Sequence, residues 1–181
     1  GEPRTLPGGD LNGDRVPDVV LVTNSMNGSS RDQQVVFFLG PGKRGGVSSG
    51  GIVPQERTGN LLMSGTGWVL RNGSASVGLG DLNGDSVLDL VVANNSEVIV
   101  RLGQGDGTLG DAITHTGGGE WAVLGHLNGD SALDAVVQSP QNNTVNVRLG
   151  QGDGTLAAPV SYAASGDRVA VGHLNSDGFL D

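Results

Sequence analysis

Short apolar runs and Gly-rich polar segments follow one another along the chain. Residues 143–149 (NTVNVRL) alternate the apolar side chains Val145, Val147 and Leu149 with polar ones, which is the period-two pattern of a strand with one drier face. Residues 88–93 (LDLVVA) are apolar on both faces, as expected of a strand that lies between two neighbouring sheets. The pattern predicts an all-β protein with many turns.

Four strands are predicted for each unit of this pattern. Strand A covers residues 75–80, 121–125 and 169–172, each just before an acidic loop, and strand B follows that loop. Strand C ends at a recurring Leu, and strand D lies around residues 111–116 and 158–163. The GQGDGT segments between strands C and D are predicted to be Gly-rich turns.

Two landmarks recur along the chain at similar spacing. The acidic loops begin at Asp10, Asp81, His126 and His173, which are 71, 45 and 47 residues apart. The segment RLGQGDGTL occurs twice without change, at an interval of 47 residues. Periods of about 40–50 residues are typical of four-stranded propeller blades. The predicted fold class is therefore all-β, a β-propeller of four-stranded antiparallel blades.

The repeats divide the chain into three complete blades and the start of a fourth, within one propeller segment. They cover about 5–75, 76–120, 121–167 and 168–181, and the first carries insertions near 24–34 and 47–67. Closed propellers have about four to eight blades. We therefore expect either that the polypeptide continues beyond Asp181 or that a neighbouring chain completes the structure in a head-to-tail assembly.

Composition and charge exclude several classes of protein. The 181 residues include 33 Gly and no Cys, are 3% aromatic and carry a net charge of −9. The absence of Cys removes disulfide frameworks, thiol catalysis and Cys-based zinc sites. No apolar run approaches the roughly 18 residues of a membrane span, and nucleic acids require basic patches. We expect neither membrane insertion nor nucleic-acid binding.

Acidic residues gather in the loops between strands A and B. In residues 81–89, oxygen-bearing side chains occupy positions 1, 3, 5 and 9, namely Asp81, Asn83, Asp85 and Asp89. With the backbone carbonyl at position 7, these oxygens suit a hard cation such as Ca²⁺, which takes about six to eight oxygen ligands. The alternative is a set of turns capped by their own Asp and Asn side chains. Four copies in register favour the cation.

The pattern D-x-N-x-D-x-x-x-D, followed by "vvan" and "vrLGqGDGTl", resembles the FG-GAP/VCBS repeat family, which includes the propeller of integrin α-subunits. The resemblance covers nearly the whole chain apart from the two insertions. It implies a calcium-binding β-propeller with the ion loops on one face and ligands usually on the other. By this resemblance a calcium role falls to Asp10, Asn12, Asp14, Asp18, Asp81, Asn83, Asp85, Asp89, Asn128, Asp130, Asp134, Asn175, Asp177 and Asp181. The carbonyls at position 7 belong to Val16, Val87, Ala132 and Phe179.

Two departures from the family pattern concern positions 1 and 6 of the loops. His126 and His173 replace Asp at position 1. Imidazole nitrogen is a poor partner for Ca²⁺, so two of the up to four sites are expected to be weaker, to lack that ligand or to stay empty. A Zn²⁺ or pH-switch role for these His residues is the alternative. Position 6 is Gly only at Gly178, and a positive φ there would cost each other residue about 1 kcal/mol.

Four Asn-x-Ser/Thr sequons are candidates for N-glycosylation. Strand alternation places them on the face opposite the acidic loops, and chance pairing in an Asn- and Ser-rich chain is the alternative reading. The four residues are Asn27, Asn72, Asn94 and Asn142.

A few other side chains have a structural and a functional interpretation. Trp121 is predicted either to form a sugar-stacking platform or, preferentially, to pack between blades. Asp106 and Asp153, in the two GQGDGT segments, are predicted turn formers.

No catalytic constellation is found, because the chain has no G-x-S-x-G elbow, no H-E-x-x-H and no P-loop. We therefore predict a calcium-stabilised, extracellular or cell-surface propeller that acts as a non-catalytic scaffold in adhesion or in carbohydrate or protein recognition. Its expected partners are a protein or glycan ligand, or copies of itself. The alternatives are a subunit of a head-to-tail, glycosylated extracellular filament and an accessory domain of a larger secreted enzyme that acts on polysaccharide.

Overall fold

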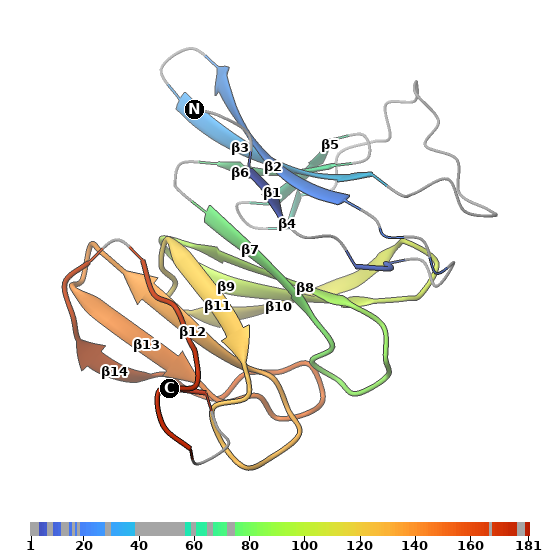
Figure 1. Ribbon diagram of the computed structural model, residues 1–181. Coiled ribbons are helices and arrows are strands. Elements are labelled where there is room, and N and C mark those ends of the chain that lie inside the picture. Colours follow the sequence, from blue (N-terminus) through green and yellow to red (C-terminus); the bar gives the residue numbers. More distant parts are fainter. Residues whose placement is uncertain are drawn as a thin grey trace. The chain divides into compact units, whose positions relative to one another are not determined.

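The computed structural model describes residues 4–6, 9–11, 15, 17, 19–27, 30–38, 57–58, 61–64, 67–71, 75–166, 168–176 and 180–181. Within these ranges the regular structure consists of strands alone (Figure 1). The chain divides into two compact units, which we describe separately. The first comprises Gly1–Ser74 with Gln104–Thr108, and the second comprises Ala75–Gly103 with Leu109–Asp181.

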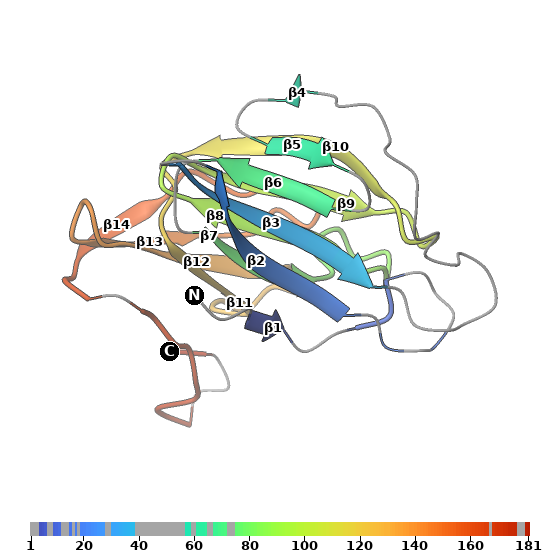
Figure 2. The same cartoon turned by 90° about the horizontal axis from the view of Figure 1, so that it is seen from above.

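The first unit contains a six-stranded sheet in the order β1-β2-β3-β6-β5-β4 (Figure 2). Its strands are β1 (Arg4–Leu6), β2 (Val19–Asn27), β3 (Ser30–Phe38), β4 (Arg57–Thr58), β5 (Leu61–Ser64) and β6 (Gly67–Arg71). The first four positions of this order repeat the predicted A-B-C-D meander. The four-stranded blade predicted for the first repeat is wrong, because part of the expected insertion near 47–67 forms two further strands, β5 and β4, that extend the sheet.

The second unit contains two four-stranded antiparallel meanders, in the orders β10-β9-β8-β7 and β11-β12-β13-β14. We call them sheet B and sheet C. Sheet B consists of β7 (Ala75–Gly80), β8 (Asp89–Asn94), β9 (Glu97–Gly103) and β10 (Leu109–Thr116). Sheet C consists of β11 (Trp121–Gly125), β12 (Asp134–Ser139), β13 (Thr144–Arg148) and β14 (Val160–Ala163). The prediction of four-stranded antiparallel sheets is confirmed for these two repeats.

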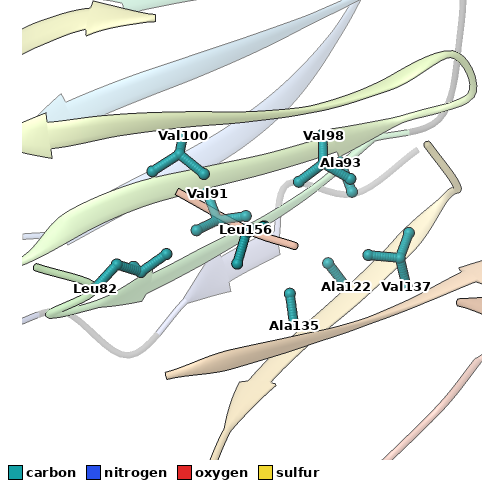
Figure 3. Packing of buried hydrophobic residues seen from close by; sticks show 9 residues of the cluster. All are labelled: Leu82, Val91, Ala93, Val98, Val100, Ala122, Ala135, Val137 and Leu156. Carbon is teal, nitrogen blue, oxygen red and sulfur yellow. The ribbon is translucent and has the colours of Figure 1, made fainter. Parts of the chain in front are cut away.

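The core of the second unit lies between sheets B and C (Figure 3). Its fully buried members Val91, Val98 and Val100 come from sheet B, and Ala135 and Val137 come from sheet C. Burial of each such Val side chain contributes about 1.5–3 kcal/mol. Short side chains let the two sheets approach closely, and this face-to-face contact sets the position of the loops at the sheet ends.

The alternating pattern of β13 is buried in the opposite sense to the prediction. Arg148 and Asn146 are buried, whereas Leu149 is 42% exposed. In the register of sheet C, Arg148 stands beside Ala135 and Asn146 beside Val137, so the polar face of β13 is the one turned toward sheet B. The prediction of a dry face carrying Val145, Val147 and Leu149 is therefore wrong, because the neighbouring sheet covers the other side.

The three complete blades predicted for the chain are not found in its described part, where no closed ring is seen. Residues 169–172, expected to form strand A of a fourth blade, form no strand there. Gly172 and Asp181 instead exchange two backbone hydrogen bonds of 3.1 and 2.8 Å. The same pairing begins β7–β8 at Gly80 and Asp89 and β11–β12 at Gly125 and Asp134.

No helix in the described ranges is long and apolar enough to cross a membrane.

Candidate functional site

The loop that joins β7 to β8 is folded around the carboxylate of Asp81. We call residues 81–89 the Asp-headed loop. One oxygen of Asp81 accepts hydrogen bonds from the N–H groups of Gly84 (2.7 Å) and Asp85 (3.2 Å), and the other accepts one from Ser86 (2.8 Å). Ser86, at position 6, has φ 67°, a left-handed conformation that costs a non-Gly residue about 1 kcal/mol. Position 6 of this loop therefore has the left-handed conformation whose cost was considered from the sequence.

The side chains at positions 3 and 5 of the Asp-headed loop bond to each other. The amide nitrogen of Asn83 donates to a carboxylate oxygen of Asp85 at 2.8 Å, and the Asn83 oxygen accepts from the backbone N–H of Asp85 at 3.1 Å. The other Asp85 oxygen accepts from the N–H of Val87 at 2.7 Å. Asp81, Asn83 and Asp85 therefore lie within one small loop, as predicted.

Asp89, at position 9, has a structural role in addition to any role as a ligand. It is fully buried, and its two oxygens accept hydrogen bonds from the N–H groups of Leu82 (2.7 Å) and Gly103 (2.9 Å). The carboxylate thus ties the start of its own loop to the end of β9. Burial raises the pKa of the Asp89 carboxyl against the effect of these two N–H groups, and the charges of Asp85 and Asp81 raise it further.

The donor set of the Asp-headed loop fits a hard cation by its chemistry, because every side chain at positions 1, 3, 5 and 9 offers oxygen. In the described part of the chain, however, no three His, Cys, Asp or Glu side chains form a group that could hold a metal ion. The reason is that the carboxylates point to N–H groups of the loop and of Gly103. This is also the arrangement expected of the alternative, a self-capped turn.

The loop between β11 and β12 repeats the contacts at positions 3, 5 and 9 and differs at positions 1 and 6. We call residues 126–134 the His-headed loop. Asn128 and Asp130 bond to each other at 2.8 Å, and Asp134 accepts from the N–H groups of Leu127 (2.8 Å) and Gly150 (2.9 Å). Positions 3, 5 and 9 therefore match the Asp-headed loop.

Position 1 of the His-headed loop bonds to position 7. His126 Nδ1 lies 3.0 Å from the carbonyl oxygen of Ala132, and since a carbonyl can only accept, Nδ1 is the donor. This is the carbonyl that sequence reasoning predicted as a cation ligand. Ser131 at position 6 does not have a positive φ. Without a carboxylate at position 1, nothing draws its N–H inward, and an imidazole N–H closes the loop instead.

Only parts of the first and fourth acidic loops lie within the described residues. In the first, the N–H of Arg15 donates to Asp10 at 2.7 Å, and Arg15 has φ 67°, as in the Asp-headed loop. In the fourth, Asp181 accepts from the N–H of Leu174 (2.9 Å) and from the side chain of Asn175 (3.1 Å). The predicted ligands that lie outside the described residues are Asn12, Asp14, Val16, Asp18, Asp177 and Phe179.

Two buried arginines make structural hydrogen bonds within the repeats that were not predicted from the sequence. Arg101 donates to the carbonyl of Gly110 at 2.7 Å, and Arg148 donates to that of Ala157 at 3.2 Å. Arg101 therefore connects β9 to β10, and Arg148 connects β13 to the segment before β14. Arg148 also donates to the carbonyls of Thr116 and Gly117 in the neighbouring repeat. The identical RLGQGDGTL segments were the available signal.

The GQGDGT turns have the structure predicted for them. Asp106 accepts hydrogen bonds from the hydroxyl and the N–H of Thr108, and Asp153 does the same for Thr155. These bonds, the hydroxyl bond foremost, lower the pKa of both carboxyls. Both Asp residues are therefore turn formers.

Trp121 contacts Arg168, at the start of the fourth repeat, whose guanidinium lies 5.1 Å from its ring centroid. The choice between packing between blades and a sugar-stacking platform stays a prediction.

The sequons differ in accessibility. Asn94 is 9% exposed and its oxygen accepts from the N–H groups of Ser96 and Glu97, whereas Asn142 is exposed in the turn before β13. The side chain of Asn27, at the end of β2, and the whole of Asn72 lie outside what is described.

Together, the four-stranded antiparallel sheets and their acidic loops define an all-β repeat protein. Residues 81–137 match the family model of the FG-GAP-like repeat. This stretch runs from the head of the Asp-headed loop through β8, β9, β10, β11 and the His-headed loop into β12. The family resemblance inferred from the sequence is confirmed for these residues, and such a repeat fits a β-propeller. No curated protein matches the chain.

Proposed function

We propose that the protein is a calcium-stabilised extracellular β-propeller segment that acts as a non-catalytic binding or structural scaffold. The observation that carries the proposal is the Asp-headed loop, in which Asp81, Asn83 and Asp85 surround one short turn. Burial, and then the charges of Asp85 and Asp81, raise the pKa of the Asp89 carboxyl. Carboxylates about 4 Å apart repel by roughly 4 kcal/mol near a protein surface. A divalent cation relieves that repulsion.

The residues that would hold Ca²⁺ are the side chains of Asp81, Asn83 and Asp85, with the carbonyl of Val87 and the carboxylate of Asp89. The ion would supply charge neutralisation and a rigid connection between strands A and B. The first loop shares the Asp10–Arg15 bond and is the second proposed site. The His-headed loop needs no ion, because the His126 imidazole already bonds to the position-7 carbonyl.

An extracellular location follows from the same proposal. Extracellular calcium modules bind with dissociation constants of about 10⁻⁴–10⁻³ M, and loops with few carboxylates suit a medium that contains millimolar calcium. The connections at the opposite sheet ends, such as the turn carrying exposed Asn142, are then the surface for a protein or glycan ligand.

The test is calorimetric titration of the metal-free protein with CaCl₂ and, separately, MgCl₂. We expect wild type to bind calcium and Asp81→Asn to lose the site in the Asp-headed loop. Magnesium should bind more weakly, because it demands a tighter octahedron. An absence of calcium binding at millimolar concentration would refute the proposal.

A second candidate function, a subunit of a head-to-tail assembly, is favoured by the outer face of sheet C. The side chains of Val160 and Tyr162 are 56% and 57% exposed there. The corresponding face of sheet B, with Val98 and Val100, is instead buried against sheet C. A further sheet of the same kind, supplied by a second copy, would cover this face. Sedimentation should then show concentration-dependent oligomers that Val160→Asp abolishes, and a monomer at all concentrations would refute this candidate.

A further inference from the structure

A Gly-rich turn of sheet C is hydrogen-bonded to the Asp-headed loop of sheet B. The turn is residues 151–156, between strands C and D of its own repeat. The N–H of Gly154 donates to the carbonyl of Leu82 at 3.2 Å. Leu82 and Leu156 are 2% and 4% exposed and belong to the same core cluster (Figure 3). The second residue of the Asp-headed loop is therefore held by the following repeat.

The shape of this turn requires Gly at position 154. Gly154 has φ +86°, and a Cβ there would lie 2.5 Å from Cδ2 of Leu102. The turn is closed by a bond from the N–H of Gln151 to the carbonyl of Thr155 at 3.1 Å, and Asp153 caps it through Thr155. The N–H of Gly154 is thus presented to Leu82 by a pre-formed turn.

Leu82 connects this contact to the proposed cation site. Its carbonyl accepts from Gly154, while its N–H donates to Asp89 at 2.7 Å. A chain of hydrogen bonds therefore runs from the turn of sheet C to the carboxylate at position 9. Displacement of Leu82 would move Asp89 and the start of the loop together.

We propose that the turn 151–156 positions the Asp-headed loop of the preceding repeat, so that cation binding in that loop and the packing of sheet C on sheet B strengthen each other. The cation half of this proposal rests on the proposed function. The positioning residues are Gly154 and Leu82, and neither is a ligand.

The third repeat lacks this contact in its described residues. In the described part of the chain, the carbonyl of Leu127 in the His-headed loop accepts no such backbone bond from a following turn. The His-headed loop is thus an internal reference.

The main experiment compares Gly154→Ala with Gly152→Ala in the full chain. Gly152 also has a positive φ, +74°, but a Cβ there meets nothing within 4 Å, so this variant controls for backbone strain. Calcium titrations followed by the amide NMR signals of Gly84 and Ser86 should show at least fivefold weaker binding in Gly154→Ala. Gly152→Ala should stay within twofold of wild type. Equal affinities in all three proteins would overturn the proposal.

A second measurement needs neither calcium nor the ligand assignment. In metal-free protein, Gly154→Ala should speed hydrogen exchange of the Leu82 amide at least tenfold relative to Leu127, and unchanged exchange would overturn the coupling. If wild type bound no calcium, the proposed function would fail, and this comparison alone would decide the positioning role.

A third measurement covers the case in which Gly154→Ala does not fold. Because coupling is reciprocal, calcium added to wild type should slow exchange of the Gly154 amide, and an unchanged rate would count against the proposal.

Discussion

The Asp-headed loop and the His-headed loop make the same contacts at positions 3, 5 and 9 and differ in how the loop is closed. Both pair Asn at position 3 with Asp at position 5, and both bury Asp at position 9 under two N–H groups. Asp81 accepts three N–H bonds, whereas His126 donates one bond to the carbonyl of Ala132. The two loops align in sequence but are not two copies of one site. Position 1 is a hydrogen-bond acceptor, Asp81, in one loop and a donor, His126, in the other.

The largest expected effect concerns the position at which the two loops agree. Asp89→Ala and Asp134→Ala each leave two N–H groups without an acceptor, and each such group costs about 1–3 kcal/mol when buried. We expect both variants to lose about 2–5 kcal/mol of unfolding free energy in urea titrations. Gln141→Ala, at an exposed turn, is the control and should change it by less than about 0.5 kcal/mol. A mild effect of Asp89→Ala would contradict the buried bridge.

Removal of calcium should lower the stability of the protein only through the Asp-headed loop and the first acidic loop, which begins at Asp10. With about 1 mM calcium and a dissociation constant of about 10⁻⁴–10⁻³ M, each occupied site stabilises the fold by about 0.4–1.4 kcal/mol. Thermal melts should therefore shift downward in EGTA, and Asp81→Asn should remove part of that shift. Asn128→Ala should leave the shift as it is in wild type. A midpoint unaffected by chelator would contradict the calcium claim.

Position 6 provides a smaller and purely conformational comparison. Ser86 has φ 67° and Ser131 does not have a positive φ. Ser86→Gly should stabilise the protein by up to about 1 kcal/mol, because Gly takes the left-handed conformation without a steric penalty. Ser131→Gly should be neutral or slightly destabilising. The two variants are compared by urea midpoint, and the same sign of change in both would break the distinction between the loops.

The smallest expected effect is a change of stability with pH that originates at His115, at the sheet interface. Variants of His115 and of His126 in the His-headed loop distinguish the two possible sources. Burial, followed by the charge of Arg148, lowers the pKa of His115, whose Nε2 accepts from the N–H of Leu156. The unfolded chain therefore binds this proton more readily, so the stability due to neutral His115 is complete above about pH 6.5 and is lost as pH falls from there toward the folded pKa. His115→Gln should flatten this dependence between pH 7.5 and 5.5 in thermal melts. A flattening seen instead in His126→Asn would assign it to the loop.

Much of the fold was predictable because local patterns and tertiary packing agree. Strands 75–80 and 121–125 were predicted with the bounds of β7 and β11, since each is a short apolar run that ends in Gly before an acidic loop. The first repeat was not, because β4 and β5 lie in a segment without a counterpart in the other repeats. Arg148 was assigned to a wetter face than it has, because alternation within one strand cannot show which face a neighbouring sheet will cover.

The residues that make up the candidate loop could be predicted from the sequence, but the contacts that they make could not. The spacing of Asp81, Asn83 and Asp85 identified the loop. The bond between His126 and Ala132 depends on the position of one imidazole, and the spacing of residues carries no information about it. The same holds for the contact of Gly154 with Leu82, which joins residues 72 positions apart.

We propose that the residue at position 1 decides whether an acidic loop binds calcium. Calorimetric titration of Asp81→His and His126→Asp with CaCl₂ tests it most directly. We predict that Asp81→His binds one calcium ion fewer than wild type and that His126→Asp binds one more, since the other positions of the two loops already match. Unchanged stoichiometry in both variants would contradict the account.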